Sequence, residues 1–147
     1  MISIEDILIL DEGVRLHPYE DTVGKTTIGI GRNLDDVGIS EDEAKYLLSN
    51  DLKQVRHELN NNQTLCVIYK SLSPYRQIVL ESMLFNLGLN RLLGFKLFIS
   101  ALARSDYSAA AKEMLDSKWA RQVGARAFRL ASVMQENSLS AYDRVLN

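Results

Sequence analysis

The hydrophobic positions at the start of the chain are typical of a short helix. Ile4, Ile7 and Leu8 recur at helical spacing in the segment ISIEDILILDE. The serine before them and the aspartate three residues later form a common N-terminal cap. A glycine at position 13 is the usual residue just after a helix end. The sequence therefore predicts a helix that ends at Glu12.

The next segment, from Arg15 to Gly31, changes to the alternation of a β-hairpin. Pro18 is incompatible with a helix interior, and DTVG has the composition of a turn. In TTIGIG, Ile28 and Ile30 alternate with threonine and glycine. We expect a small hairpin here, with a third strand close to it.

Every later segment with a regular pattern has the period of a helix. Ser40 and Glu43 form a capping box after the polar loop RNLDDVG, and they begin a helix of about twenty residues, about 30 Å long. The run NNN at 60–62 ends it. Serine followed by proline predicts a helix start at 73, and a glycine predicts its end at 88. Shorter helices are expected at 95–103, 106–115 and 121–134, with a last turn or two after residue 140.

The charge distribution is uneven along the chain. Residues 1–62 hold 13 acidic and 6 basic residues, residues 63–103 hold 1 and 4, and residues 104–147 hold 5 and 7, for a net charge of −2. This split suits a cleft with one acidic and one basic wall for an anionic polymer, and it also fits ordinary solvated helix faces. The acidic first half and the lack of a continuous Lys/Arg stripe disfavour a nucleic-acid-binding protein.

Composition also bears on the compartment. No segment approaches the roughly 18 consecutive apolar residues of a membrane span. The first ten residues carry Glu5 and Asp6 instead of the basic residues of a secretory signal. Cys66 is the single cysteine, so no internal disulfide can form. We expect a cytosolic product without stable membrane insertion.

Two carboxylates flank the predicted hairpin. Glu12 lies at a helix C-terminus, where the partial negative charge of the free carbonyls favours a protonated acid. A turn centred on Gly24 would place Asp21 opposite Thr27, with both side chains on one face, where they could hold a water molecule. An acid facing a carboxylate that activates water is the arrangement of glycoside hydrolysis. A helix end and a turn explain the same residues without catalysis, and both interpretations are open on spacing alone.

The segment DEGVRLHPYEDTVGKTTIGIGRN closely resembles the N-terminal signature of T-even-type phage lysozymes. GISEDEAKYLLSND resembles the family's inter-lobe helix, MLFNLG its cleft wall, and SKWARQVGARAFR its tryptophan-and-arginine segment. The resemblance covers most of the chain. It implies an α+β, lysozyme-like fold in a single domain, residues 1–147, with a cleft between two lobes. The small helix and β-hairpin lobe would span about 13–59, and the larger all-α lobe about 60–147 plus the N-terminal helix, with a long helix joining them.

The resemblance also implies an activity, namely hydrolysis of the β-1,4 bond between N-acetylmuramic acid and N-acetylglucosamine in peptidoglycan by an inverting mechanism. Glu12 becomes the general acid that protonates the glycosidic oxygen. Asp21 becomes the carboxylate that helps to activate the water, and Thr27 positions that water. We expect no cofactor and no metal, since acid, base and water suffice for this chemistry.

Further residues match substrate-binding positions of the family. Phe85 and Asn86 match a Phe-Gln pair that lines the cleft, although an aromatic residue in MLFNLG is also typical of a core. Arg126 matches the arginine that approaches the acid from the helical lobe, and a surface base is its alternative role. Trp119 is expected in the core. Arg32 replaces a histidine of the family, and we expect it to contact substrate or to pair with one of the two aspartates at 35 and 36.

The biological role that the resemblance implies is host lysis by a phage or prophage endolysin. Such a protein, expected to be monomeric, would stay in the host cytoplasm until a holin gives it access to the periplasm and cell wall. Two alternatives use the same cleft. A catalytically silent wall-binding module is disfavoured by the intact Glu12, Asp21 and Thr27. A lytic transglycosylase would leave anhydro-sugar ends, and Asp21 beside Thr27 has no obvious task in that reaction.

Overall fold

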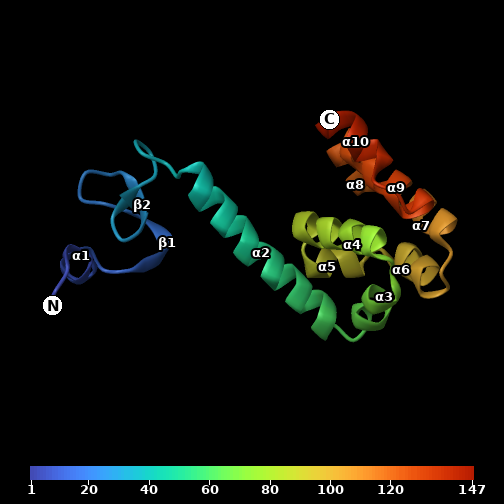
Figure 1. Cartoon of the computed structure of the whole chain (residues 1–147), viewed down its shortest axis with the longest axis horizontal. Coiled ribbons are helices and arrows are strands. Elements are labelled where there is room, and N and C mark those ends of the chain that lie inside the picture. The colour runs from blue at the N-terminus through green and yellow to red at the C-terminus, as the bar shows by residue number, and fades with distance from the viewer. The chain divides into compact units, whose positions relative to one another are not determined.

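The computed structural model describes all residues from 1 to 147, and the chain falls into two compact units, residues 1–48 and 49–147. Ten helices and one small antiparallel sheet confirm the predicted α+β class (Figure 1). Helix α2, Glu41–Asn61, runs from the first unit into the second, and at 21 residues it has the predicted length. The predicted lobe boundaries, near residues 13 and 59, stay predictions. No helix is both long and apolar enough to cross a membrane.

The first unit begins with helix α1, Ile4–Glu12, whose two ends are as predicted. At its start, the Ser3 Oγ accepts a hydrogen bond from the Asp6 amide at 3.1 Å, and the Asp6 carboxylate accepts one from the Ser3 amide at 2.9 Å. These bonds from Ser3, the backbone one foremost, lower the pKa of Asp6. At its end, Gly13 adopts a φ of +74°, which stops the helix directly after Glu12.

The sheet has three antiparallel strands, β1 (Arg15–Glu20), β2 (Thr26–Gly29) and the two-residue β3 (Arg32–Asn33), in that order. The predicted pairing of Asp21 with Thr27 is wrong, because Thr27 pairs with Tyr19. The hairpin closes at Asp21, whose amide donates to the Lys25 carbonyl at 2.9 Å, so Gly24 lies after the centre of the turn. The shift is two residues, and an even shift keeps each side chain on its predicted face.

The second unit is entirely helical and contains the hydrophobic core, which runs in sequence from Val55 to Met134. Helix α9 packs against α4 and α7, and α7 also packs against α6 (Figure 1). Phe98 is among the largest fully buried side chains. The helices are α3 (Leu65–Ser71), α4 (Pro74–Leu87), α5 (Leu89–Leu93), α6 (Lys96–Ala103), α7 (Tyr107–Leu115), α8 (Lys118–Val123), α9 (Ala125–Glu136) and α10 (Ser140–Leu146).

Most of the predicted helices occur where local sequence signals placed them. Helix α4 starts after the cap residue Ser73 with proline in its first turn, and it ends at Leu87, directly before Gly88. The single helix predicted at 121–134 is wrong, because Gly124, with a φ of +59°, separates α8 from α9. Helices α3 and α5 were not predicted. Helix α5 has no side-chain hydrogen bond at its N-terminal cap, whereas the start of α3 is capped by Asn62, whose Oδ1 accepts the amides of Thr64 and Leu65 at 3.0 Å each.

Candidate active site

Glu12 lies at the end of α1, and its carboxylate packs against the backbone of Gly31. A Cβ atom added to Gly31 would lie 3.0 Å from Glu12 Oε2 and 3.1 Å from its Cδ. Gly31 also has a φ of +71°, a conformation that side chains other than glycine's rarely adopt. The carboxylate of Glu12 therefore occupies space that only glycine leaves free.

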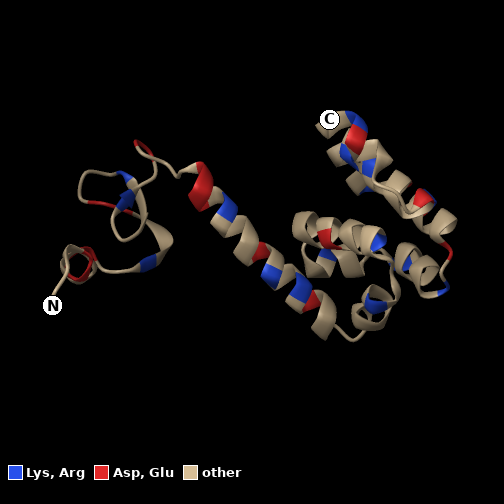
Figure 2. Ribbon diagram, in the orientation of Figure 1, with Lys and Arg blue, Asp and Glu red and all other residues tan.

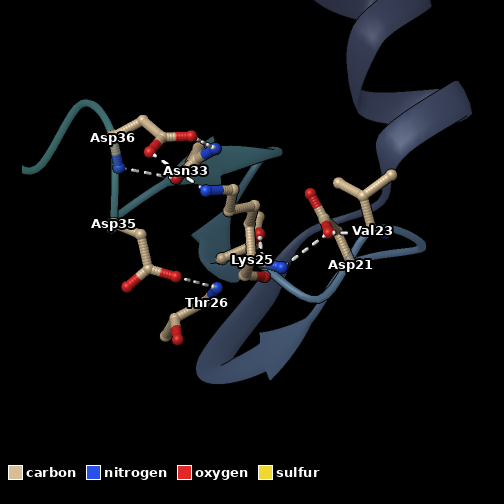
Figure 3. A network of polar contacts seen from close by, with 8 residues as sticks. Asp21, Val23, Lys25, Thr26, Asn33, Asp35 and Asp36 are labelled. Carbon is tan, nitrogen blue, oxygen red and sulfur yellow. Dashed lines mark hydrogen bonds and ion pairs between the residues drawn. The ribbon is translucent and has the colours of Figure 1, made fainter.

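Asp21 follows β1 and organises the turn of the hairpin. Its Oδ1 accepts hydrogen bonds from the amides of Val23 at 2.9 Å and Lys25 at 2.8 Å (Figure 3). The Asp21 carbonyl accepts a further bond from the Gly24 amide at 3.1 Å. Both side-chain bonds go to Oδ1, which leaves Oδ2 available to a further donor.

Thr27 lies in the central strand and is the one buried polar residue of the chain, with 3% of its surface exposed. Its hydroxyl donates a hydrogen bond to the Lys25 carbonyl at 3.0 Å. A threonine hydroxyl has one proton and two lone pairs. Because the proton is already given to Lys25, the Thr27 oxygen is oriented to accept a bond from another donor.

Asp21 and Thr27 are thus connected through the backbone of Lys25, whose amide bonds the first and whose carbonyl bonds the second. The sequence predicted that these two side chains would be neighbours across a strand pair. The structure connects them instead through one residue of the turn. A carboxylate and a hydroxyl oriented by the backbone of the same residue can take part in binding one water molecule.

The loop after β3 contacts this hairpin through two aspartate side chains. Asp35 Oδ2 accepts a bond from the Thr26 amide at 2.8 Å, and Asp36 Oδ1 lies 3.3 Å from Lys25 Nζ (Figure 3). Asp36 also binds Asn33 through both its amide and its carboxylate. The two loop aspartates therefore hold β2 and its turn.

Arg32 pairs with neither of these aspartates, so that part of its prediction is wrong. Its Nη1 donates to Glu43 Oε1 at 2.7 Å and to the Gly38 carbonyl at 3.1 Å. Glu43 Oε1 also accepts the Ser40 amide at 2.9 Å, as the predicted capping box requires. The hydrogen bond from Arg32, followed by those from Ser40, holds the pKa of Glu43 at about 2.

The remaining candidates lie in the helical unit, near the C-terminal half of α4. Phe85 is 46% exposed and lines a groove of about 570 Å³, so the alternative of a core position is wrong. Asn86 Oδ1 accepts a bond from Trp119 Nε1 at 2.8 Å, and Trp119 is buried, as predicted. Arg126 Nη2 donates to the hydroxyl of Ser82, one turn before Phe85, at 3.1 Å.

The two units differ in charge. Residues 1–48 hold 11 acidic and 4 basic residues, and residues 49–147 hold 8 and 13 (Figure 2). The structure therefore assigns the three catalytic candidates Glu12, Asp21 and Thr27 to the acidic unit and Arg126 to the basic one.

Sequence reasoning missed two contributors to this site. Gly31 had a usable signal, because a glycine inside a strand pattern often marks the close approach of another group. Lys25 had none, because it contributes through its amide and carbonyl, and these are the same in every residue type except proline.

A family model described as phage lysozyme matches residues 10–134 of the chain. The chain is 33% identical over 166 aligned positions to probable T4-type lysozyme 1 of Dictyostelium discoideum, a match that covers 95% of this chain and 98% of that protein. It is 31% identical over 114 positions to an endolysin of Acyrthosiphon pisum secondary endosymbiont phage 1, a match that covers 75% of this chain and 72% of that endolysin. The pre-baseplate central spike protein Gp5 of Enterobacteria phage T4 is 26% identical over 96% of this chain, which corresponds to 29% of the spike protein.

The fold and these similarities define a glycoside hydrolase of the lysozyme type, for which peptidoglycan is the substrate. The chain belongs to the phage lysozyme family.

Proposed function

We propose that the protein hydrolyses the β-1,4 bond between N-acetylmuramic acid and N-acetylglucosamine of peptidoglycan with inversion at the anomeric carbon. In an inverting enzyme one carboxylic acid protonates the leaving oxygen while a carboxylate activates water on the other face of the sugar. About 6.5–9.5 Å between the two carboxyl groups leaves room for that water.

Glu12 is the general acid of this proposal, and Asp21 with Thr27 binds the attacking water. The observation that carries the assignment is the double use of Lys25, whose backbone orients both Asp21 Oδ1 and the Thr27 hydroxyl. Asp21 Oδ2 accepts a hydrogen bond from the water and takes that proton as the water oxygen bonds the anomeric carbon, while the Thr27 oxygen accepts a hydrogen bond from the other O–H of the water, which stays bonded. Preorganised acceptors of this kind lower the reorganisation that the reaction requires.

We propose further substrate contacts on the helical unit. The exposed ring of Phe85 offers an apolar face for a sugar, and the Asn86 amide group, held by Trp119, offers hydrogen bonds. Arg126, half-buried and bonded to Ser82, supplies a positive charge for the carboxylates of the wall polymer. The prediction that Arg32 binds substrate stays a prediction.

The biological role we propose is that of an endolysin. It would accumulate as a monomer in the host cytoplasm, and a holin would give it access to the periplasm and cell wall. Similarity to an endolysin supports this role. Expression in a Gram-negative host should leave cells intact without a holin and lyse them when a holin is expressed with it. Lysis without any holin would contradict this part of the proposal.

The reaction is tested by mass spectrometry of fragments released from purified Gram-negative peptidoglycan. The wild type should release hydrated muropeptides with reducing ends, and Glu12→Gln should be slower by about 10²–10⁴-fold. Asp11→Asn, which removes the exposed acid next to Glu12 on the same helix, is the matched control and should keep its activity. NMR identifies the anomer that forms first at the new reducing end, and an α-anomer there shows inversion at the cleaved β-1,4 bond.

Each alternative has its own result in the same experiment. Anhydro-sugar ends would identify a lytic transglycosylase. Binding to peptidoglycan without any release would identify a silent wall-binding module. An active Glu12→Gln variant would remove Glu12 from the mechanism.

A further inference from the structure

The carboxylate of Glu12 depends on the position of one backbone segment. Its Oε2, Cδ and Cγ all lie within 3.3 Å of the place where a Gly31 Cβ would be. The Glu12 side chain is otherwise exposed, at the end of a helix with no buried residue. Movement of Gly31 would therefore change the surroundings of the proposed acid directly.

The segment that contains Gly31 has little secondary structure to hold it. The strand that follows, β3, is only the two residues Arg32 and Asn33, and its partners in β2 are Ile28 and Thr27. A ladder this short provides few backbone hydrogen bonds. Side chains must therefore contribute to fixing the position of β3.

The Arg32 side chain supplies such a connection, to the start of α2. One nitrogen, Nη1, bonds both Glu43 Oε1 at 2.7 Å and the Gly38 carbonyl at 3.1 Å. Glu43 is itself fixed, because its carboxylate accepts the Ser40 amide and its own amide donates to the Ser40 hydroxyl. The guanidinium therefore joins β3 to the capping box of a 21-residue helix.

We propose that Arg32 is a positioning residue for the general acid: by binding Glu43 it holds Gly31 against the carboxylate of Glu12. In this role it acts through Gly31 and the β3 backbone, and the predicted contact of Arg32 with the glycan is the rival that the experiment distinguishes. The expected effect of Arg32 on the reaction rate rests on the proposed function. The structural part of the proposal concerns the contact between Gly31 and Glu12, which exists without substrate.

The experiment compares Arg32→Ala and Arg32→Lys with the wild type. Lys45→Ala is the control, because it breaks another exposed ion pair in the first turns of α2, Lys45 with Glu41 at 3.1 Å, that has no link to β3. For each protein, kcat and KM are measured on a soluble peptidoglycan oligomer. The nuclear Overhauser effect between the Glu12 side-chain protons and the Gly31 α-protons is measured without substrate.

Arg32→Ala should lower kcat about tenfold or more with KM within about twofold, the signature of lost transition-state interactions. The Overhauser effect should weaken in the same variant. Arg32→Lys, which can still reach a carboxylate, should recover most of both quantities, and Lys45→Ala should change neither. If Arg32→Ala does not fold, Arg32→Met, which keeps an aliphatic side chain but has no donor for Glu43 or the Gly38 carbonyl, replaces it with the same expected results.

Two results would overturn the proposal. A raised KM with unchanged kcat would make Arg32 a substrate contact. An unchanged Overhauser effect in Arg32→Ala would show that Gly31 is held by other means. A wild type without muramidase activity, in which the Overhauser effect still depends on Arg32, would refute the proposed function and support the structural role.

Discussion

Replacing Gly31 by alanine would separate backbone strain from displacement of the general acid. An alanine with positive φ costs about 1–2 kcal/mol relative to glycine. Gly29, two residues earlier, offers a close match, since its φ is +69° against +71° for Gly31. A Cβ on Gly29 would meet nothing within 4 Å. Gly29→Ala therefore measures the strain alone.

The additional effect at Gly31 follows from the distance to Glu12. The added Cβ would be 3.0 Å from Oε2, and ordinary contact begins at 3.4 Å, so the carboxylate must move by about 0.4 Å. If a displacement of about 1 Å costs about 100-fold in rate, this movement costs about sixfold. The carboxylate is the free end of a flexible side chain, so the same movement should cost little stability.

The two variants should therefore unfold with nearly equal losses, about 1–2 kcal/mol each, and differ in turnover. Urea unfolding measures the first quantity, and release of muropeptides at saturating substrate measures kcat. Gly31→Ala should be about sixfold slower than Gly29→Ala. Equal kcat values in the two variants would refute the argument that Gly31 determines the position of Glu12.

Three further predictions concern stability. Trp119→Phe loses the 2.8 Å bond to Asn86 and should cost about 1 kcal/mol in urea unfolding, whereas an unchanged midpoint would contradict this. Phe98→Ala, at 1% exposure, should lose about 3–5 kcal/mol by calorimetry, and a loss below 1 kcal/mol would show that the core collapses around the cavity. The pKa of Glu43 is lowered from its usual value of 4.5 to about 2, so its ionised carboxylate contributes to the stability of the fold fully above pH 4.5. This contribution is lost as the pH falls toward 2. Glu43→Gln should remove that part of the pH dependence of unfolding, and an identical pH curve would disprove the linkage.

The helix ends could be predicted because capping is local. Ser3, Ser40 and Ser73 each accept a bond from an amide three residues later, and Gly13 and Gly88 follow their helices at positive φ. These signals need only a few neighbouring residues. Helix α5, which has no such cap, gave no comparable signal, and its formation depends on packing in the helical unit. Asn62 caps α3, but in the sequence it was interpreted only as part of the run that ends α2.

The hairpin register could not be predicted from the position of its glycine. The Asp21 side chain binds two amides of a turn that is centred one residue before Gly24, which shifts the strand pairing by two residues. The partner of Arg32 was missed for a related reason. Glu43 lies 11 residues away, and the nearer aspartates are already engaged by the backbone of Thr26 and the side chain of Lys25. Competition among several acceptors is decided in three dimensions, so the family resemblance could propose the residues of the candidate site but not the contacts that hold them.

The use of the Lys25 backbone by both Asp21 and Thr27 has an evolutionary consequence. Every amino acid except proline offers the same amide and carbonyl, so the orientation of Asp21 and Thr27 does not depend on the identity of the side chain at position 25. Neutral drift can replace the lysine, with loss only of its exposed pairing with Asp36. Proline would remove the amide that binds Asp21. A deep mutational scan for lytic activity should therefore accept nearly all substitutions at this position, with proline as the exception.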